Sequence, residues 1–337
     1  MSVDLLTNLP LDLLEQVLGS DSGISCKEIA RVCTVNKAFQ NLCNSETYWE
    51  RQCRRLRYDH FDGYLLIGDL GPPPGGGTWR EYYKWRCLNC PVEGNVLSSI
   101  NSAFCKACEQ GFFPIVLALI AAGANVNAAT NYGSTALIVA ANRGHFAIVQ
   151  ALLAAPGIHV NDALMNSGSA ALTLAASNGH VAIVQALLAA GANVNSTGNN
   201  GWTALILAAV DGHLFVVRAL IAAGANVNAA LLMNGNTALS HAASSGRVDI
   251  VEALLAAPGI HINATLVDDG WTALVLAAIG GHVAVVQALL AMPGIDVNAA
   301  DNYGRTALSL AGSVGKATEP SLVQALCDAG AVEKRPV

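Results

Sequence analysis

The chain has 337 residues, enough for two or three domains, and its formal net charge of −6 argues against general nucleic-acid binding. Hydrophobic residues make up 53% of the chain and the mean hydropathy is +0.42, but polar residues interrupt each apolar run before it reaches the length of a membrane span. Residues 1–10 do not have the pattern of a secretory signal, so the nine cysteines indicate a reducing, intracellular setting, in the cytoplasm or the nucleus.

The first predicted domain, residues 1–57, contains three expected helices. Pro10 suits the first turn of a helix, and the residues after it form an apolar stripe of Leu13, Leu14, Val17 and Leu18. A capping box at residues 25–28 starts a second helix, and a third is expected over residues 45–56. A unit of this size is not very stable alone, so it would gain stability by packing on a partner.

Residues 58–97 are predicted to connect this domain to the rest of the chain. They contain a flexible loop, GPPPGGGT, and then an aromatic helix that a second capping box, Thr78–Glu81, begins. Residues 1–97 carry 22 charged side chains, whereas the 240 residues after them carry only 20. This change in composition predicts a domain boundary near residue 97.

From residue 98 onward the chain repeats one frame: Gly-x-Thr-Ala-Leu, then Ala-Ala, Gly-His, an apolar run and Val-Asn. The glycine that opens the frame, called the frame glycine below, recurs every 33 to 35 residues, at Gly133, Gly168, Gly201, Gly235, Gly270 and Gly304. Residues 98–131 form a degenerate first copy, which gives about seven repeats over residues 98–337. A period of this length indicates stacked units that bury their apolar faces against one another.

One repeat illustrates the expected structure. Thr203 is predicted to cap a first helix that extends to Asp211, and Gly212 is predicted to end it in the left-handed conformation. A second helix is expected over residues 214–223, and a hairpin then leads back to Gly235. Small alanines would let the helices of neighbouring repeats approach closely.

This frame resembles the ankyrin repeat, which implies an all-α solenoid of helix-turn-helix units with short β-hairpin loops, a fold that binds proteins. The sequence departs from the family's Thr-Pro-Leu-His pattern, because alanine replaces the proline and other residues replace the histidine. The loss of that histidine removes a usual hydrogen bond between repeats, so we expect more reliance on apolar packing.

The N-terminal domain resembles the F-box through Leu9-Pro10, Leu13-Leu14, Val17-Leu18 and the ordered apolar residues that follow, up to Trp49. This resemblance implies docking on a Skp-type adaptor of a cullin–RING ubiquitin ligase, with an interface formed by Leu9, Pro10, Leu13, Leu14, Val17 and Leu18. An F-box followed by alanine-rich ankyrin repeats is also similar to proteins of some large DNA viruses, in which case the adaptor would be the host's. The alternative is a generic helical cap on the repeats.

Four aromatic residues flank frame glycines at positions where the frame does not require an aromatic side chain: Tyr132, Trp202, Trp271 and Tyr303. Tryptophan and tyrosine are common anchors of protein interfaces. We therefore predict that these four residues bind the target, with Trp202 and Trp271 as the main anchors. The alternative is that each ring only shields a neighbouring hairpin.

Two sets of residues have the composition of metal sites. Cys87, Cys90, Cys105 and Cys108 have zinc-like spacing, but the repeat register places Cys105 and Cys108 at helix positions where cysteine acts as a small buried hydrophobic side chain. Zinc remains the alternative. Equivalent histidines, His145, His180, His213 and His282, lie too far apart for one metal ion and are interpreted as turn residues that bind backbone. The asparagine of each Val-Asn is likewise interpreted as a structural residue of its hairpin.

No catalytic or phosphate-binding motif is recognised, so we expect a protein that is not an enzyme and has no cofactor. The leading hypothesis is the substrate receptor of a ubiquitin ligase, a monomer outside that complex, which binds no nucleic acid. The alternatives are a non-catalytic scaffold, or a decoy that occupies the adaptor without ubiquitin transfer.

Overall fold

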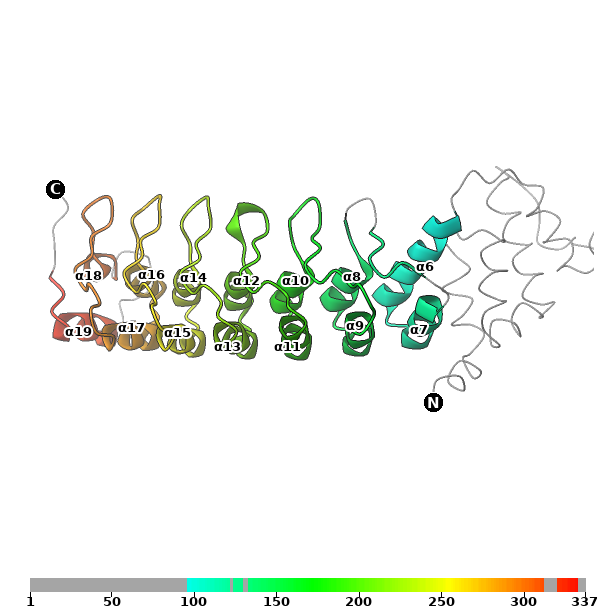
Figure 1. Cartoon of the computed structure of the whole chain (residues 1–337). Helices are drawn as coiled ribbons and strands as arrows, with labels where there is room; N and C mark the ends of the chain where they lie inside the picture. The colour runs from blue at the N-terminus through cyan, green and yellow to red at the C-terminus, as the bar shows by residue number, and fades with distance from the viewer. Residues whose placement is uncertain (1–95, 122–123, 130–132, 312–319, 333–337) are drawn as a thin grey trace, which may run out of the picture. The chain divides into compact units, whose positions relative to one another are not determined.

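The structure, a computed structural model, describes residues 96–121, 124–129, 133–311 and 320–332 (Figure 1). The chain divides into two compact units, residues 1–140 with 147–158, and residues 141–146 with 159–337. The domain predicted at residues 1–57 and its six adaptor-binding residues lie outside the described residues, as does nearly all of the connector.

The described secondary structure is helical, with isolated β-bridges at the hairpins. The first unit contains α6 (Val96–Gln110), α7 (Phe113–Ala121), the start of α8 (Ala136–Arg143) and most of α9 (Phe146–Leu153). The second unit contains α10 (Ala171–Ser177), α11 (Val181–Ala189), the 3-10 turn η1 (Asn199–Gly201), α12 (Ala204–Asp211), α13 (Leu214–Ala222), α14 (Ala238–Ser244), α15 (Val248–Leu255), α16 (Ala273–Gly280), α17 (Val283–Leu290), α18 (Ala307–Leu310) and α19 (Pro320–Asp328). The predicted all-α architecture of stacked helix pairs is confirmed.

In the second unit the helices form two rows. The first helices of successive repeats, α10, α12, α14, α16 and α18, contact one another in order, and the second helices, α11, α13, α15, α17 and α19, do the same. Each first helix also packs on the second helix of its own repeat. The hairpins between repeats all project on the same side of these rows (Figure 1).

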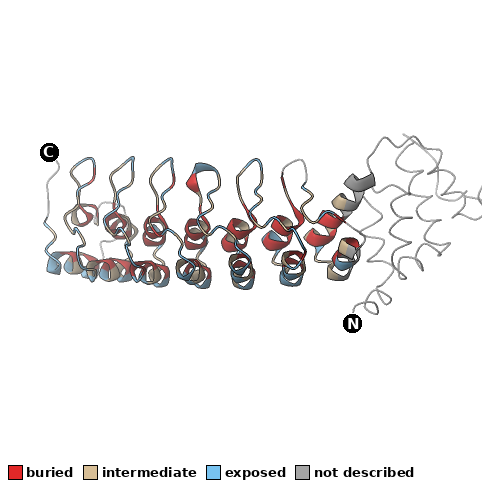
Figure 2. Cartoon of the chain, viewed as in Figure 1, coloured by how far each residue is buried: buried red, intermediate tan, exposed pale blue. Residues whose placement is uncertain are grey.

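Buried residues lie where the two rows of helices face each other (Figure 2), and small side chains make up part of this core. The alanine pairs of the frame are buried in each full repeat of the second unit, at Ala175-Ala176, Ala208-Ala209, Ala242-Ala243 and Ala277-Ala278. Each of the second helices α11, α13, α15 and α17 also buries one leucine completely, beside two buried valine or isoleucine residues: Leu187, Leu220, Leu254 and Leu289. Because each repeat buries this surface only against its neighbours, the stability of one repeat depends on the next.

The helix ends follow the predicted local chemistry. The Thr203 hydroxyl accepts a hydrogen bond from the Ile206 N–H at the start of α12, and Gly212 ends that helix with φ +89°. At the position of the family's missing histidine, Ser240 and Ser309 instead close capping boxes with Thr237 and Thr306. Three other residues at that position, Ile138, Ile206 and Val275, are buried, as expected if apolar packing replaces the histidine.

Hydrogen bonds between repeats are nevertheless abundant, and they come from other positions. The asparagine of each Val-Asn pair is here called a bridging asparagine. Its side chain forms hydrogen bonds with the next repeat, and not within its own hairpin as the sequence had indicated. Asn228 shows the pattern: its Nδ2–H donates to the Gly259 carbonyl at 2.8 Å, and its Oδ1 accepts from the His261 N–H at 2.7 Å. The Nδ2–H donor is repeated between Asn127 and Gly157, Asn161 and Gly191, Asn263 and Gly294, and Asn298 and Gly330.

The turn between the two helices of a repeat supplies a second link. As predicted, two of the histidines there, His213 and His282, bind backbone, but the backbone belongs to the preceding repeat. His213 Nε2 lies 2.8 Å from the Ser177 carbonyl oxygen, and His282 Nε2 lies 3.0 Å from that of Ser244. Arg247 takes the same role, with its guanidinium donating to the Val210 carbonyl at 3.0 Å.

Replacing Asn228 with alanine should lower the free energy of unfolding by about 1–3 kcal/mol, because two hydrogen bonds to the next repeat are lost. Urea denaturation followed by circular dichroism measures this change. Asn226→Ala is the matched control, since the Asn226 side chain accepts only from Asn228 of its own hairpin. Equal losses in the two variants would contradict a linking role for the bridging asparagine.

Candidate protein-binding face

The hairpins are formed by short antiparallel pairings around the frame glycines. In the second unit, Ala163 pairs with Ala170, Thr197 with Thr203 and Ala230 with Thr237. The frame glycines have φ between +66° and +86°, a region that side chains with a Cβ rarely adopt. The frame therefore requires glycine at the tightest point of each hairpin.

Successive hairpins are joined directly by their backbones. The N–H of Leu232 donates to the Asn200 carbonyl at 2.9 Å, and the N–H of Val267 donates to the Asn234 carbonyl at 3.0 Å. The pairs Asn199–Ser167 and Asn302–Asp269 continue this ladder along the second unit. Consequently the hairpins of this unit form one continuous face instead of separate loops.

Frame glycines also make room for the next hairpin. A Cβ on Gly235 would lie 3.0 Å from Cγ2 of Val267, and a Cβ on Gly270 would lie 2.7 Å from Oδ1 of Asn302. Any larger residue would push the hairpins apart, so close contact between hairpins is a second reason for glycine.

Trp202, one of the predicted anchors, is half-buried and contacts the next repeat. Its ring stacks on His241 of α14, with ring centroids 5.9 Å apart and planes inclined by 25°. Burial lowers the pKa of His241, whose Nε2 is enclosed and makes no hydrogen bond within the described structure. The Trp202 ring thus covers an uncharged imidazole between two repeats.

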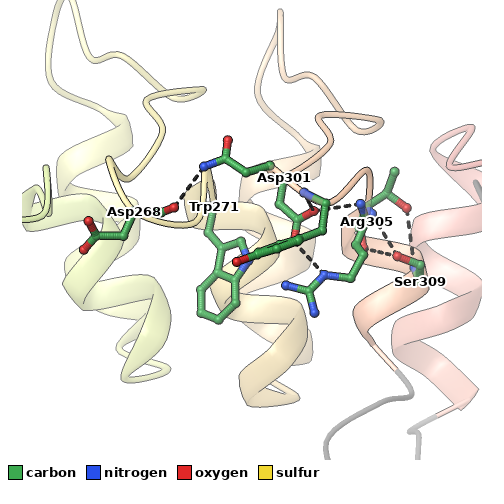
Figure 3. A network of polar contacts seen from close by, with 8 residues as sticks. Asp268, Trp271, Asp301, Arg305 and Ser309 are labelled. Carbon is green, nitrogen blue, oxygen red and sulfur yellow. Dashed lines mark hydrogen bonds and ion pairs between the residues drawn. The ribbon is translucent and has the colours of Figure 1, made fainter. Parts of the chain in front are cut away.

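Trp271 is held by the next hairpin in a different way (Figure 3). Its indole N–H donates to Oδ2 of Asp301 at 3.1 Å, and the same oxygen accepts from Nε of Arg305 at 2.8 Å. The other carboxylate oxygen, Oδ1, accepts from the backbone N–H groups of Tyr303 and Arg305. Asp301 is buried, so these four hydrogen bonds all end on a carboxyl group that is shielded from solvent.

The hydrogen bonds of this network determine whether the Asp301 carboxyl group is charged. Burial by itself would raise the pKa of Asp301, but hydrogen bonds from Arg305, Tyr303 and Trp271 favour the charged form more strongly and lower it. Asp301 is therefore ionised at neutral pH and ties two hairpins together as a carboxylate.

Tyr303 is the most exposed of the three predicted target-binding residues that the structure describes. It is 64% exposed, and the Arg305 guanidinium lies 4.9 Å from the centre of its ring, in a cation–π contact. Tyr132 lies outside the described residues. Both tryptophans thus contact a neighbouring repeat, Trp271 its hairpin and Trp202 its helix α14, whereas Tyr303 is largely exposed. Binding of a target by these residues stays a prediction.

The second pair of cysteines is buried in α6, as the repeat register predicted. Burial raises the pKa of the Cys105 thiol to about 11 and raises that of Cys108 further, and the Cys105 thiol lies 3.7 Å from the Ala128 carbonyl oxygen that accepts its hydrogen bond. Cys87 and Cys90 lie outside the described residues. Within the part of the chain that the structure describes, no three or more His, Cys, Asp or Glu residues are placed to hold a metal ion.

The hairpin face also presents large aliphatic side chains that the sequence analysis did not single out. Met165, Leu232, Met233 and Val267 are between 67% and 80% exposed. The sequence signal that could have identified them is hairpin length: the three hairpins that carry them have one residue more between the bridging asparagine and the frame glycine than the hairpin that ends at Gly201.

Comparisons with known proteins agree with this architecture. A family model described as "Ankyrin repeats (3 copies)" matches residues 87–163, 104–198, 172–266 and 263–335. The search of curated proteins found no match. Among the described helices, none is long and apolar enough to cross a membrane.

Asp301→Asn should remove a pH-dependent contribution to stability. Because the pKa of Asp301 is lower in the folded chain than the value of about 3.9 in an unfolded chain, this contribution is complete above pH 3.9 and is lost as the pH falls through the folded value. The difference in free energy of unfolding between the wild type and the variant should therefore be largest near neutral pH and shrink in acid. Urea denaturation at a series of pH values measures it.

Trp271→Phe tests the same network without removing the charge, and should reproduce part of the loss at neutral pH. Glu252→Gln, which neutralises an exposed carboxylate on α15, is the control and should change stability little. A difference between wild type and Asp301→Asn that does not vary with pH would show that the carboxylate is not stabilised in its charged form.

Proposed function

The chain belongs to the ankyrin-repeat family. We propose, in addition, that it is the target-binding subunit of a cullin–RING ubiquitin ligase. Ankyrin repeats bind protein partners, so a role in protein–protein interaction follows from the family itself. The finer proposal adds that residues 1–57 dock on a Skp-type adaptor while the hairpin face holds the target. The ordered apolar residues from Leu9 to Leu18, which resemble an F-box and precede the repeats, support this addition.

In this proposal the chain contributes position and no chemistry. Residues 98–337 would hold the target, and the adaptor and cullin would bring the ubiquitin-transferring subunits to it, so that catalysis depends on proximity. This role requires a rigid link between the bound target and the rest of the chain. The ladder of backbone hydrogen bonds between hairpins, such as Leu232 to Asn200 at 2.9 Å, supports such a rigid surface in the second unit.

Target recognition is proposed to use Tyr132, Trp202, Trp271 and Tyr303. The observation that carries this proposal is the exposure of Tyr303, whose ring is already oriented by the Arg305 guanidinium. A large aromatic side chain that is held in place before binding loses little conformational entropy when a partner covers it. Trp202 and Trp271 would add the parts of their rings that stay exposed beside their contacts with the next repeat.

The proposed setting is intracellular, where adaptor and cullin occur. The similarity of the domain order to proteins of large DNA viruses suggests that the adaptor belongs to a host cell. A decoy that occupies the adaptor, or a scaffold that binds none, are the alternatives that the following experiment separates.

The Leu9→Ala/Pro10→Ala double variant should lose adaptor binding and keep target binding, because only the apolar start of the F-box-like segment changes. Affinity capture of the tagged full-length chain, with quantitative mass spectrometry, measures both. Tyr303→Ser is the reciprocal variant and should lose target while it keeps the adaptor. Circular dichroism of both variants controls for folding.

Each result has a distinct meaning. Recovery of adaptor together with cullin supports the ligase subunit, and recovery of adaptor without cullin indicates the decoy. A chain that captures neither adaptor nor cullin is a scaffold, and adaptor capture that survives the Leu9→Ala/Pro10→Ala change shows that this segment is not an F-box.

A further inference from the structure

The hairpins of the second unit are of two kinds. In the shorter kind, which ends at Gly201 or Gly304, the frame glycine is the sixth residue after the bridging asparagine. In the longer kind, which ends at Gly168, Gly235 or Gly270, it is the seventh. In the longer kind, leucine occupies the third position after the bridging asparagine and a large aliphatic residue the fourth. The third-position leucine packs inward, as Leu231 shows with 6% exposure, whereas Leu232 beside it is 80% exposed.

The chain itself shows that the fold does not need an apolar side chain at this fourth position. The shorter hairpins have Asn199 and Asn302 there, and each Nδ2–H donates to a carbonyl of the preceding hairpin, Asn166 at 2.6 Å and Asp268 at 2.9 Å. Leu232 and Val267 keep the backbone hydrogen bond of this position but have no side-chain amide to donate. They replace a stabilising polar side chain with exposed apolar surface.

Leu232, Met233 and Val267 lie together and are called the apolar cluster below. Their exposed fractions are 80%, 73% and 67%. Val267 donates its N–H to Asn234, the residue after Met233, so the two hairpins that carry the cluster are bonded directly. Met165 has the same exposed character but belongs to a hairpin two repeats before that of Leu232, with the hairpin that ends at Gly201 between them.

The charges around the apolar cluster indicate what would cover it. The hairpin segments 159–170, 193–203, 226–237, 261–272 and 296–306 contain five aspartates and one basic residue of the Lys/Arg type, Arg305. That arginine is already paired with Asp301 at 2.8 Å. Asp268 and Asp269 directly follow Val267, and Asp268 is exposed. A partner with positive charges beside large apolar side chains would complement this surface, whereas an anionic lipid surface would be repelled.

We propose that the apolar cluster is the docking surface for a short segment of a partner protein that combines large apolar with basic side chains. This inference rests on the proposed function to the extent that the hairpin face binds a protein, and it names the chemistry of that protein. Leu232 and Val267 insert between apolar side chains of the segment, and Asp268 and Asp269 pair with its basic residues.

The test uses the full-length chain and a displayed library of random twelve-residue peptides as the probe. Enriched peptides are synthesised, and their Kd is measured by fluorescence polarisation with the wild type and with the Leu232→Asn/Val267→Asn variant. Asparagine is the residue that the chain already has at this position in its shorter hairpins, so the variant should fold with an unchanged melting temperature. The enriched peptides should carry net positive charge with large apolar residues, and the variant should bind them at least about tenfold more weakly.

Phe215→Gln is the matched control, because Phe215 is a 70% exposed apolar residue on α13, away from the hairpins, and its variant should bind the peptides as the wild type does. Peptides that are acidic or wholly polar, or that bind Leu232→Asn/Val267→Asn unchanged, overturn the inference. It is equally overturned if sedimentation shows a wild-type dimer that the variant abolishes, or if the wild type binds vesicles of phosphatidylcholine and phosphatidylserine through the cluster.

The same selection separates this inference from the proposed function. Peptides whose binding depends on Tyr303 but not on Leu232 and Val267 leave the hairpin face as a protein-binding surface and overturn only the role of the apolar cluster. A selection that enriches no peptide overturns the inference and leaves the proposed function to the capture experiment with adaptor and cullin.

Discussion

The hydrogen bonds that join each repeat to the next are the interaction on which the rest of this structure depends. Alanine pairs let neighbouring helices approach closely, but alanine side chains are too small and too uniform to determine how one repeat is positioned along the next. The bridging asparagines supply that information, because Asn228 binds both the Gly259 carbonyl and the His261 N–H. His213, His282 and Arg247 add a second link on the other side of the first helices, between the turn of one repeat and the helix end of the repeat before it.

The sequence predicted the features that are decided within a few residues. The first helix of the illustrated repeat was expected to begin at its Thr203 cap and end at Gly212, and it does; the second was expected over residues 214–223 and extends from Leu214 to Ala222. The features that the sequence did not predict connect residues about thirty positions apart. The sequence pattern places each bridging asparagine in a hairpin but does not predict its bonds to the next repeat, nor the bond from Trp271 to Asp301, because both depend on the distance between neighbouring repeats.

The candidate site divides in the same way. The residue types of Trp202, Trp271 and Tyr303 are unusual within the frame, and the sequence shows this. It does not show the orientation of each ring, and in the structure both tryptophans contact the next repeat. The sequence alone does not mark Leu232 and Val267 as exposed, because aliphatic residues in an apolar stretch are usually part of the core. Only the comparison with Asn199 and Asn302 at the same position shows that these side chains are not needed by the fold. The adaptor-binding prediction at Leu9 to Leu18 stays a prediction.

If neighbouring repeats hold one another's hairpins, the backbone amides that cross between hairpins must be protected in the free protein. Hydrogen exchange of the Leu232, Val267 and Asn302 amides, measured by NMR on the full chain, tests this directly, because each donates to the preceding hairpin at 2.9 to 3.0 Å. The structure predicts exchange of these amides much slower than that of an unfolded peptide, with Asn228→Ala reducing the protection most at the hairpins on either side of the substitution. Exchange of all three at the rate of an unfolded peptide would show that the hairpins move independently, and would contradict a pre-formed binding face.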